Sequence, residues 1–176
     1  DGDDTIEGGI GDDTLNGGDG DDNIEGSDGV DIIHGGDGDD FLVDTGISTI
    51  YGGSGNDFFF QPGDGTRPYG LEVYGEDGDD DFYYLSNVKI LEAGIGDDIV
   101  AISSATNQSP ISISGGDGYD KLTINANYPY WSVISGFEEI SADGTGVIPD
   151  HIGVAGTTLK FSYVNQANLD FSAETD

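Results

Sequence analysis

The amino-acid sequence predicts an all-β fold in which short strands and tight turns stack coil upon coil as a solenoid. The main observation is a nonapeptide, Gly-Gly-x-Gly-x-Asp-x-U-x with U a large apolar residue, that recurs through residues 1–123. Glycine and aspartate crowd its first six positions, which favours a turn, and only the last three positions suit a strand. No apolar run approaches the ~20 residues of a membrane-spanning helix.

The repeats can be placed one after another along the chain. Full copies occupy residues 8–16, 17–25, 26–34, 35–43, 52–60, 75–83, 93–101 and 115–123, after a partial copy at 2–7. The U side chains are expected to point inward and stack into a thin core. The first of them are Ile6, Leu15, Ile24, Ile33, Leu42 and Phe59. Between the later copies, alternating apolar residues predict further short strands at Leu71 and Val73 and at Ile111 and Ile113.

The nonapeptide resembles the repeat of the repeats-in-toxin (RTX, haemolysin-type) calcium-binding family, and the resemblance covers roughly residues 1–123. It implies an all-β, right-handed parallel β-roll with calcium in the turns. In such a roll each nonapeptide supplies a six-residue turn and a three-residue strand, and two nonapeptides complete one coil.

The residue types at these positions are consistent with calcium. The chain has no cysteine, and the turns offer carbonyl and carboxylate oxygens, which suit a hard cation that takes 6–8 oxygen ligands. We expect glycines at positions 1, 2 and 4 to allow backbone angles closed to other residues. An EF-hand does not fit, because "DGDDNIE" (19–25) lacks the glycine and glutamate register of that loop.

The spacing of the position-6 aspartates predicts two rows of turns. One edge of the roll carries Asp4, Asp22, Asp40, Asp57, Asp80, Asp98 and Asp120. The opposite edge carries only Asp13 and Asp31 before "DTGISTIY" (44–51), which we expect to form an ordinary turn. Ions between successive turns, held by odd residues of one turn and even residues of the next, would number six on the long edge and about one on the short edge. The prediction is about seven Ca²⁺ ions.

The candidate metal-binding residues are the turn positions that would present these oxygens. They are Asp4; Gly8, Ile10, Asp12 and Asp13; Gly17, Gly18, Asp19, Gly20, Asp21 and Asp22; Ser27, Gly29 and Asp31; Gly35, Gly36, Asp37, Gly38, Asp39 and Asp40; Gly52, Gly53, Ser54, Gly55, Asn56 and Asp57; Gly75, Glu76, Asp77, Gly78, Asp79 and Asp80; Ala93, Gly94, Ile95, Gly96, Asp97 and Asp98; and Gly116, Gly118 and Asp120. Glu76 and Ala93 replace glycine, so we expect strained backbone and weaker binding in their turns.

Composition restricts the partners. The 176 residues carry 36 acidic and 4 basic side chains, a net charge of −32, which argues against nucleic acid, anionic membranes and polyanionic ligands and favours cations. Acidic residues and glycine thin out after about residue 120. We therefore expect a calcium-binding roll over residues 1–123 and a calcium-free β cap or extension over 124–176, with "YPYWS" (128–132) covering the end of the roll.

Nothing in the sequence indicates catalysis. His34 and His151 have no nearby nucleophile or ligand spacing, and no oxyanion turn or phosphate loop is visible. The leading hypothesis is a structural module of a large secreted or cell-surface bacterial protein that folds on binding calcium, its partners being calcium and neighbouring domains. The alternatives are a carbohydrate-binding accessory module of a secreted enzyme and a non-catalytic part of such an enzyme.

Overall fold

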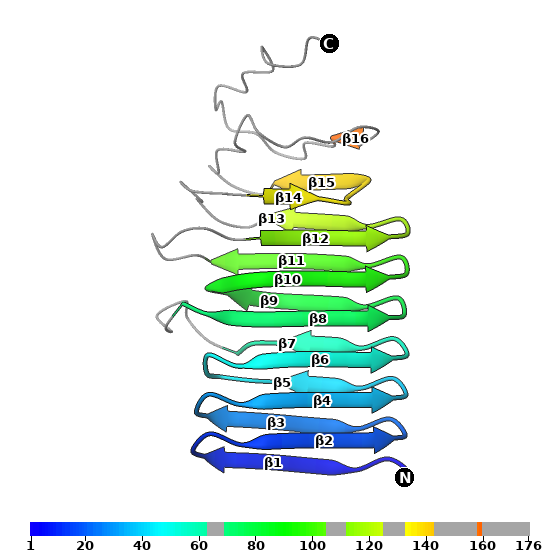
Figure 1. Ribbon diagram of the computed structural model, residues 1–176. Helices are drawn as coiled ribbons and strands as arrows, with labels where there is room; N and C mark the ends of the chain where they lie inside the picture. The colour runs from blue at the N-terminus through cyan, green and yellow to red at the C-terminus, as the bar shows by residue number, and fades with distance from the viewer. Residues whose placement is uncertain (63–68, 105–111, 125–132, 143–157, 160–176) are drawn as a thin grey trace.

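The computed structural model of the protein describes residues 1–62, 69–104, 112–124, 133–142 and 158–159. All regular structure in these ranges is β-strand, and the strands form two parallel sheets that stack coil upon coil (Figure 1). No helix long and apolar enough to cross a membrane is found in the described ranges. The predicted parallel β-roll is confirmed.

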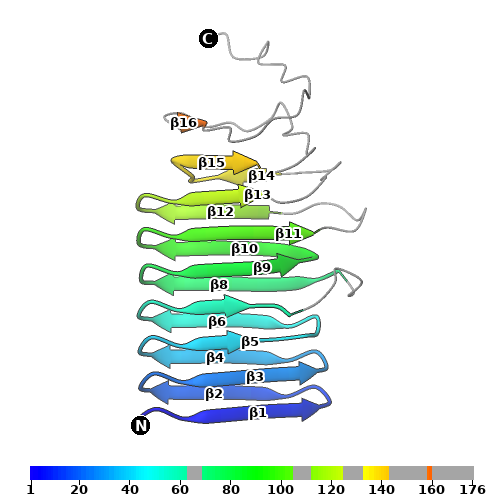
Figure 2. The ribbon, with the colours of Figure 1, turned by 180° about the vertical axis from the view of Figure 1, so that it is seen from behind.

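The odd-numbered strands build one sheet in sequential order, as seen from behind in Figure 2. They are β1 (Thr5–Ile10), β3 (Asn23–Asp28), β5 (Phe41–Val43), β7 (Phe58–Phe60), β9 (Asp81–Ser86), β11 (Ile99–Ser104), β13 (Lys121–Ile124), β15 (Glu139–Ala142) and β16 (Thr158–Leu159). The even-numbered strands build the other. They are β2 (Thr14–Asp19), β4 (Ile32–Asp37), β6 (Thr49–Ser54), β8 (Leu71–Asp77), β10 (Val88–Ile95), β12 (Ser112–Asp117) and β14 (Val133–Ser135).

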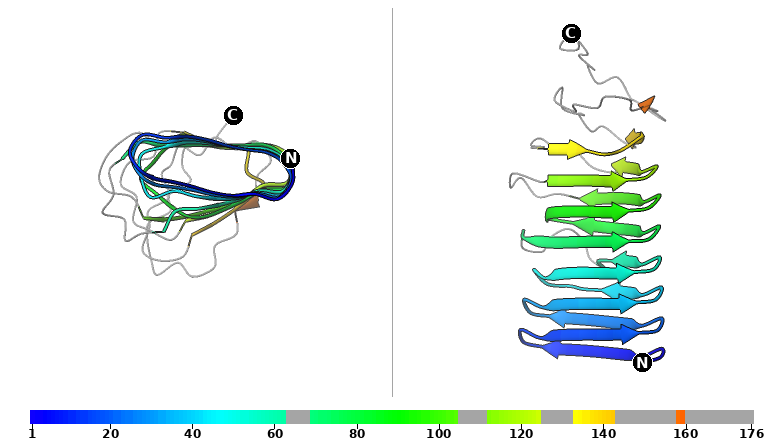
Figure 3. Two further views of the ribbon diagram at one scale, coloured as in Figure 1. Left: turned by 90° about the horizontal axis from the view of Figure 1, so that it is seen from below. Right: turned by 45° about the vertical axis from the view of Figure 1, so that its right-hand side comes forward.

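The core is a single layer of apolar side chains between the two sheets. Viewed along the stack, the coils superpose as a flattened oval whose two long sides are the sheets (Figure 3). Since strand side chains alternate, the U residue of each repeat points inward. Ile24, Ile33, Leu42 and Phe59 are fully buried, and Ile6 and Leu15 at the first coil pack against them partly buried, as predicted. The Phe59 and Phe82 rings stack with their centroids 4.5 Å apart.

Each coil repeats its register even where its length differs. Ile24 pairs with Leu42, Leu42 with Phe59 and Phe59 with Phe82, at spacings of 18, 17 and 23 residues. The missing or extra residues of these coils do not lie in the Gly-Asp turns along the right-hand edge in Figure 1. That edge therefore stays in register over the described coils.

The strand pairing continues across residue 123. Thr123 pairs with Ser141, and Ile113 with Ile134, so β14 and β15 add to the same two sheets. Ile111, "YPYWS" and His151 lie outside the described residues. His34 lies on the outer face of its sheet, stacked on Tyr51. The division into two regions at residue 123 stays a prediction.

Candidate calcium-binding turns

The position-6 carboxylates form two rows of hydrogen bonds that run from coil to coil. Along the right-hand edge, which we call the long ladder, each backbone N–H at position 6 donates to Oδ1 of the aspartate one coil on, at 2.7–2.9 Å. The long ladder comprises Asp4, Asp22, Asp40, Asp57, Asp80, Asp98 and Asp120. On the opposite edge Asp13 donates to Asp31 at 2.9 Å, which starts the short ladder. The two rows predicted from spacing are confirmed.

The second oxygen of these carboxylates has no protein partner. Oδ2 is buried without a hydrogen bond in eight position-6 aspartates. They are Asp13, Asp22, Asp31, Asp40, Asp57, Asp80, Asp98 and Asp120. A buried polar group without a partner costs free energy, and a buried carboxylate costs the most. The repetition of one orphaned oxygen per turn therefore points to a cation that the turns are built to hold.

Oxygens from two successive coils converge beside each of these atoms. A Cβ added to Gly17 would lie 2.1 Å from Asp22 Oδ2 and 2.6 Å from the carbonyl oxygen of Gly35. At Gly52 the corresponding distances are 2.2 Å to Asp57 Oδ2 and 2.7 Å to the Gly75 carbonyl oxygen. Position 1 is thus glycine in most turns because a carboxylate oxygen of the same turn and a carbonyl oxygen of the next coil occupy the space beside its Cα.

The carbonyl groups of the turn alternate in direction, as the sequence predicted. At positions 2 and 4 they point to the following coil: Gly18 O lies 2.0 Å from the place of a Cβ on Gly36, and Gly38 O lies 2.1 Å from that on Gly55. At position 3 they point back, since Asp37 O accepts the N–H of Gly20 at 2.8 Å. Even positions of one turn and odd positions of the next therefore face the same interval, which is the reverse of the predicted order. An oxygen-only set of this kind fits Ca²⁺.

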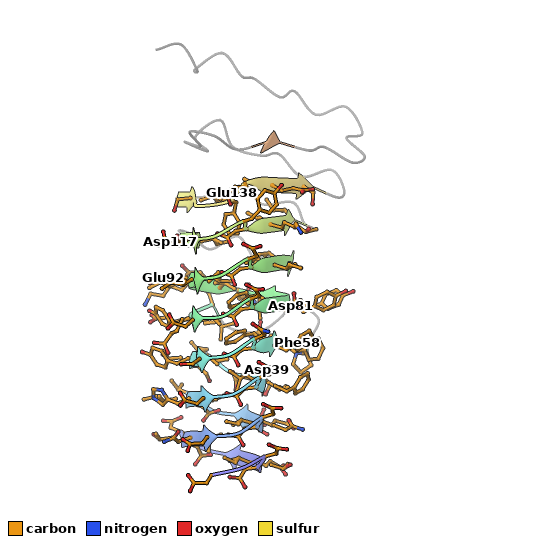
Figure 4. All side chains as sticks on the ribbon, turned by 90° about the vertical axis from the view of Figure 1, so that its right-hand side faces the viewer. Asp39, Phe58, Asp81, Glu92, Asp117 and Glu138 are labelled. Atoms are coloured by element: carbon orange, nitrogen blue, oxygen red, sulfur yellow. The ribbon has the colours of Figure 1, made fainter. Side chains whose placement is uncertain are left out.

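The position-5 side chains form an outer row that runs the opposite way. Asp21, Asp39 and Asn56 are exposed, and the Oδ1 of each accepts the position-5 N–H of the following coil at 2.7–3.0 Å. Asp3, Asp79 and Asp97 do the same on this edge, and Asp12 on the other. In Figure 4 the long edge faces the viewer, with Asp39 labelled in this outer row. These side chains link the turns of successive coils.

Burial opposes ionisation of the inner carboxylates when no metal is bound. It raises the pKa of Asp80 to about 8, that of Asp57 to about 7 and that of Asp98 to about 6, and neighbouring carboxylates add to each rise. The pKa values of Asp40 and Asp120 are also raised, first by burial. In the metal-free fold these carboxylates are therefore harder to ionise than they are in water.

The expectation about backbone strain is partly wrong. Positive φ values occur at positions 2 and 4 of the turns, including Ser27 at 75° and Glu76 at 79°, so the strain expected at Glu76 is real. Ala93 at position 1 has no positive φ, because position 1 lies within a strand and needs space rather than an unusual angle. Gly29 at position 4 also lacks the positive φ of its counterparts.

Two further residues extend the ladders and a third, Asp44, lies near the short ladder, although the nonapeptide pattern missed all three. Glu138 extends the long ladder, since its Oε2 accepts the N–H of Asp120 at 2.8 Å. Ser48 extends the short ladder, since its Oγ accepts the N–H of Asp31 at 2.9 Å. Asp44 is buried near Asp31. The signal for Glu138 was its distance of 18 residues from Asp120, one coil length, without a surrounding glycine motif.

The described residues contain no group of three or more His, Cys, Asp or Glu side chains gathered as a metal centre. The turns differ from such a centre because each interval combines few carboxylates with several backbone carbonyls. The position-3 side chains, such as Ile10, Asp19 and Ile95, are exposed, so that only their backbone oxygens are available to an ion between the coils. Which of the predicted residues bind an ion stays a prediction.

The family model of the RTX calcium-binding nonapeptide repeat matches residues 1–31, 16–43 and 44–60 in four copies. No curated protein and no solved structure gave a match to the chain. The later turns share the hydrogen bonds and orphaned oxygens of the matched ones, through Asp80, Asp98 and Asp120. The chain therefore carries RTX calcium-binding nonapeptide repeats, coiled into a parallel β-roll.

Proposed function

We propose that the chain is a calcium-dependent structural module that folds when Ca²⁺ enters the turns and stabilises a larger extracellular or cell-surface protein. The observation that carries the proposal is the buried, unpartnered Oδ2 in eight position-6 aspartates, one per turn. No side chain or backbone donor of the described residues satisfies these oxygens. A divalent cation between two coils would do so and would neutralise two facing turns at once.

The proposed sites lie in the intervals between successive turns. Asp4 to Asp120 define six intervals on the long ladder, and Asp13 and Asp31 define one on the short ladder. Each ion would take a position-6 carboxylate oxygen, the position-2 and position-4 carbonyls of its turn and the position-1 carbonyl of the next. In the second interval these are Asp22 Oδ2, Gly18 O, Gly20 O and Gly35 O.

Binding of this kind couples to folding. A net charge of −32 keeps the metal-free chain expanded, and the binding free energy of the ions becomes folding free energy. Extracellular calcium modules bind with dissociation constants of ~10⁻⁴–10⁻³ M, so a chain with such sites stays unfolded at cytosolic calcium and folds outside the cell. This suits a secreted bacterial protein whose other domains the roll supports.

The surface of the described residues gives little support to a carbohydrate-binding role. The outer rings of His34, Tyr51 and Tyr74 stack on one another, with centroids 4.7 and 5.0 Å apart, so their faces are not free for a sugar. Both described lysines are engaged, Lys89 with Glu72 and Lys121 over the Tyr119 ring. Basic groups for a polyanionic chain are therefore lacking there, and we infer a non-catalytic, structural role.

A calcium titration tests the proposal. Circular dichroism should show a gain of strand signal as calcium is added to the chelator-treated chain, and native mass spectrometry should show about seven bound ions at saturation. Magnesium should do neither at the same concentration, because it demands a near-octahedral site and keeps its waters. An equally ordered chain in excess chelator would refute the proposal.

A further inference from the structure

We propose that the turn at residues 44–48 forms a second calcium site on the short edge, in which Asp44 and Asp31 hold one ion between their coils. The proposal rests on the proposed function, since it takes the turns to bind calcium. It reverses the expectation that this segment is an ordinary turn. The short ladder would then hold two ions rather than one.

The strand register identifies the place of Asp44 in the turn. Glu25 pairs with Val43, so the next residues, Gly26 and Asp44, both stand at position 1 of their coils. At the other end of the turn, the N–H of Asp31 donates to Ser48 Oγ, where the other steps have the Oδ1 of a position-6 aspartate. The turn thus has a carboxylate at position 1, where the nonapeptide has glycine, and a hydroxyl at position 6, where the nonapeptide has aspartate.

The Asp44 side chain replaces a backbone oxygen with a carboxylate oxygen. A Cβ on Gly17, Gly35 or Gly52 would meet the position-1 carbonyl oxygen of the following coil at 2.6–2.7 Å. A Cβ on Gly26 would instead meet Asp44 Oδ1 at 2.6 Å, together with Asp31 Oδ2 at 2.7 Å. Asp44 Oδ1 therefore faces the same interval as the oxygen that it replaces. The interval therefore holds two carboxylate oxygens, Asp31 Oδ2 and Asp44 Oδ1, in place of one carboxylate oxygen and one carbonyl oxygen.

Nothing in the described residues satisfies the two oxygens. Asp44 and Asp31 are 1% and 0% exposed, and neither Asp44 Oδ1 nor Asp31 Oδ2 has a hydrogen-bond partner. The other oxygen of Asp44 accepts the Gly46 N–H at 2.7 Å, which fixes the carboxylate in its orientation. Gln61, one coil on, directs its Oε1 to Ser86 instead. Two buried carboxylate oxygens that converge without a donor need a cation.

Further oxygens face the same interval. Ser27 O accepts the Thr45 hydroxyl, and Gly29 O lies 2.1 Å from the place of a Cβ on Gly46, so both carbonyls point toward the 44–48 turn. Each carbonyl oxygen has a second lone pair. Burial, with a contribution from Asp31, raises the pKa of Asp44 to about 6 in the metal-free fold. Burial therefore disfavours the ionised Asp44 carboxylate without a cation, as it does the carboxylates of the long ladder.

The test counts bound calcium in the full chain by native mass spectrometry at saturating calcium. Asp44→Ala should bind one ion fewer than the unchanged chain, and alanine fits position 1 because Ala93 occupies it naturally. Asp28→Asn, an exposed position-3 side chain in the preceding turn, removes the same charge and should keep the full count.

The outcomes separate this inference from the proposed function. If Asp44→Ala keeps the full count, or if Asp28→Asn loses an ion as well, the 44–48 site is refuted while calcium binding elsewhere stands. If the unchanged chain binds no calcium, the proposed function itself fails. Asp44→Asn keeps the size and the fold of the turn, and calcium titration should show one site weakened at least tenfold in it.

Discussion

Replacing the central ladder carboxylate, Asp80→Asn, should change stability in opposite directions with and without calcium. Asparagine keeps the Oδ1 that accepts the N–H of Asp57 at 2.8 Å, but it puts an amide where the orphaned Oδ2 lies. The amide carries no charge to bury, so the metal-free fold becomes more stable. It also cannot bind a cation through its nitrogen, so the calcium-bound fold loses.

The size of the gain follows from the pKa of Asp80, which burial raises from 3.8 to about 8. Folding the metal-free chain at pH 7 requires this group to take up a proton that the unfolded chain does not hold. At about 1.4 kcal/mol per pKa unit this costs up to about 4 kcal/mol, and solvent screening at the turn reduces the figure to roughly 2 kcal/mol. Asp80→Asn removes that cost. With calcium, loss of one charge-assisted contact should raise the half-saturating concentration of one ion about tenfold or more.

The assay is circular dichroism in chelator and in calcium, with Asp81→Asn as the matched control. Asp81 is the next residue in the chain and its side chain is exposed on the outer face of β9, so the variant removes the same charge without touching the ladder (Figure 4). Asp80→Asn should show more strand signal than Asp81→Asn in chelator at pH 7 and need more calcium to reach its plateau. Equal calcium requirements in the two variants would refute the assignment of Asp80 as a ligand.

Three further predictions test the turn, the end of the ladder and the pH response. Gly55→Ala should destabilise the calcium-bound roll by more than about 2 kcal/mol in urea unfolding, because φ is +130° and the new Cβ would lie 2.1 Å from Gly38 O. Gly9→Ala, at φ +96° with nothing within 4 Å, should cost only the backbone strain of a positive φ. Equal losses of stability in the two variants would contradict the steric argument. Glu138→Ala, which removes the acceptor, should lower stability by about 1 kcal/mol and expose the Asp120 amide to hydrogen exchange first. The exposed Glu7→Ala should change neither, and unchanged exchange at Asp120 in Glu138→Ala would remove Glu138 from the ladder. In chelator, strand content should rise as the pH falls, because the fold raises the pKa values of Asp98, Asp57 and Asp80 to about 6, 7 and 8. The contribution of these groups to stability is complete below about pH 4 and is lost as the pH rises through 6–8. Strand content that rises with pH would contradict this prediction.

The period of the repeat was enough to predict most of the fold. Position-6 aspartates spaced by one coil, 17 to 23 residues, predict which turns share an edge, and the hydrogen bonds from Asp4 to Asp120 follow that prediction. The U residues predicted the core because strand side chains alternate, and Leu42, Phe59 and Phe82 are fully buried in register.

The sequence did not predict the residues that take part in the turns without matching the nonapeptide pattern. Asp44 and Glu138 belong to no nonapeptide, and only the pairing of whole strands shows that they stand at positions 1 and 6. The sequence also did not predict the reason for glycine at position 1. An unusual backbone angle was expected there, but Ala93 at this position has no positive φ. Space beside a Cα is set by the next coil, 17 to 23 residues away, and local sequence does not report it.

The most direct test of the account is a crystal structure from calcium-containing solution, with the ions located by anomalous scattering. The account predicts a row of calcium peaks between successive coils on the long edge, each within about 2.3–2.6 Å of a position-6 Oδ2 such as that of Asp22, Asp57 or Asp80. Buried Oδ2 atoms without a peak beside them, or peaks only at exposed carboxylates such as Asp28 and Asp81, would contradict it.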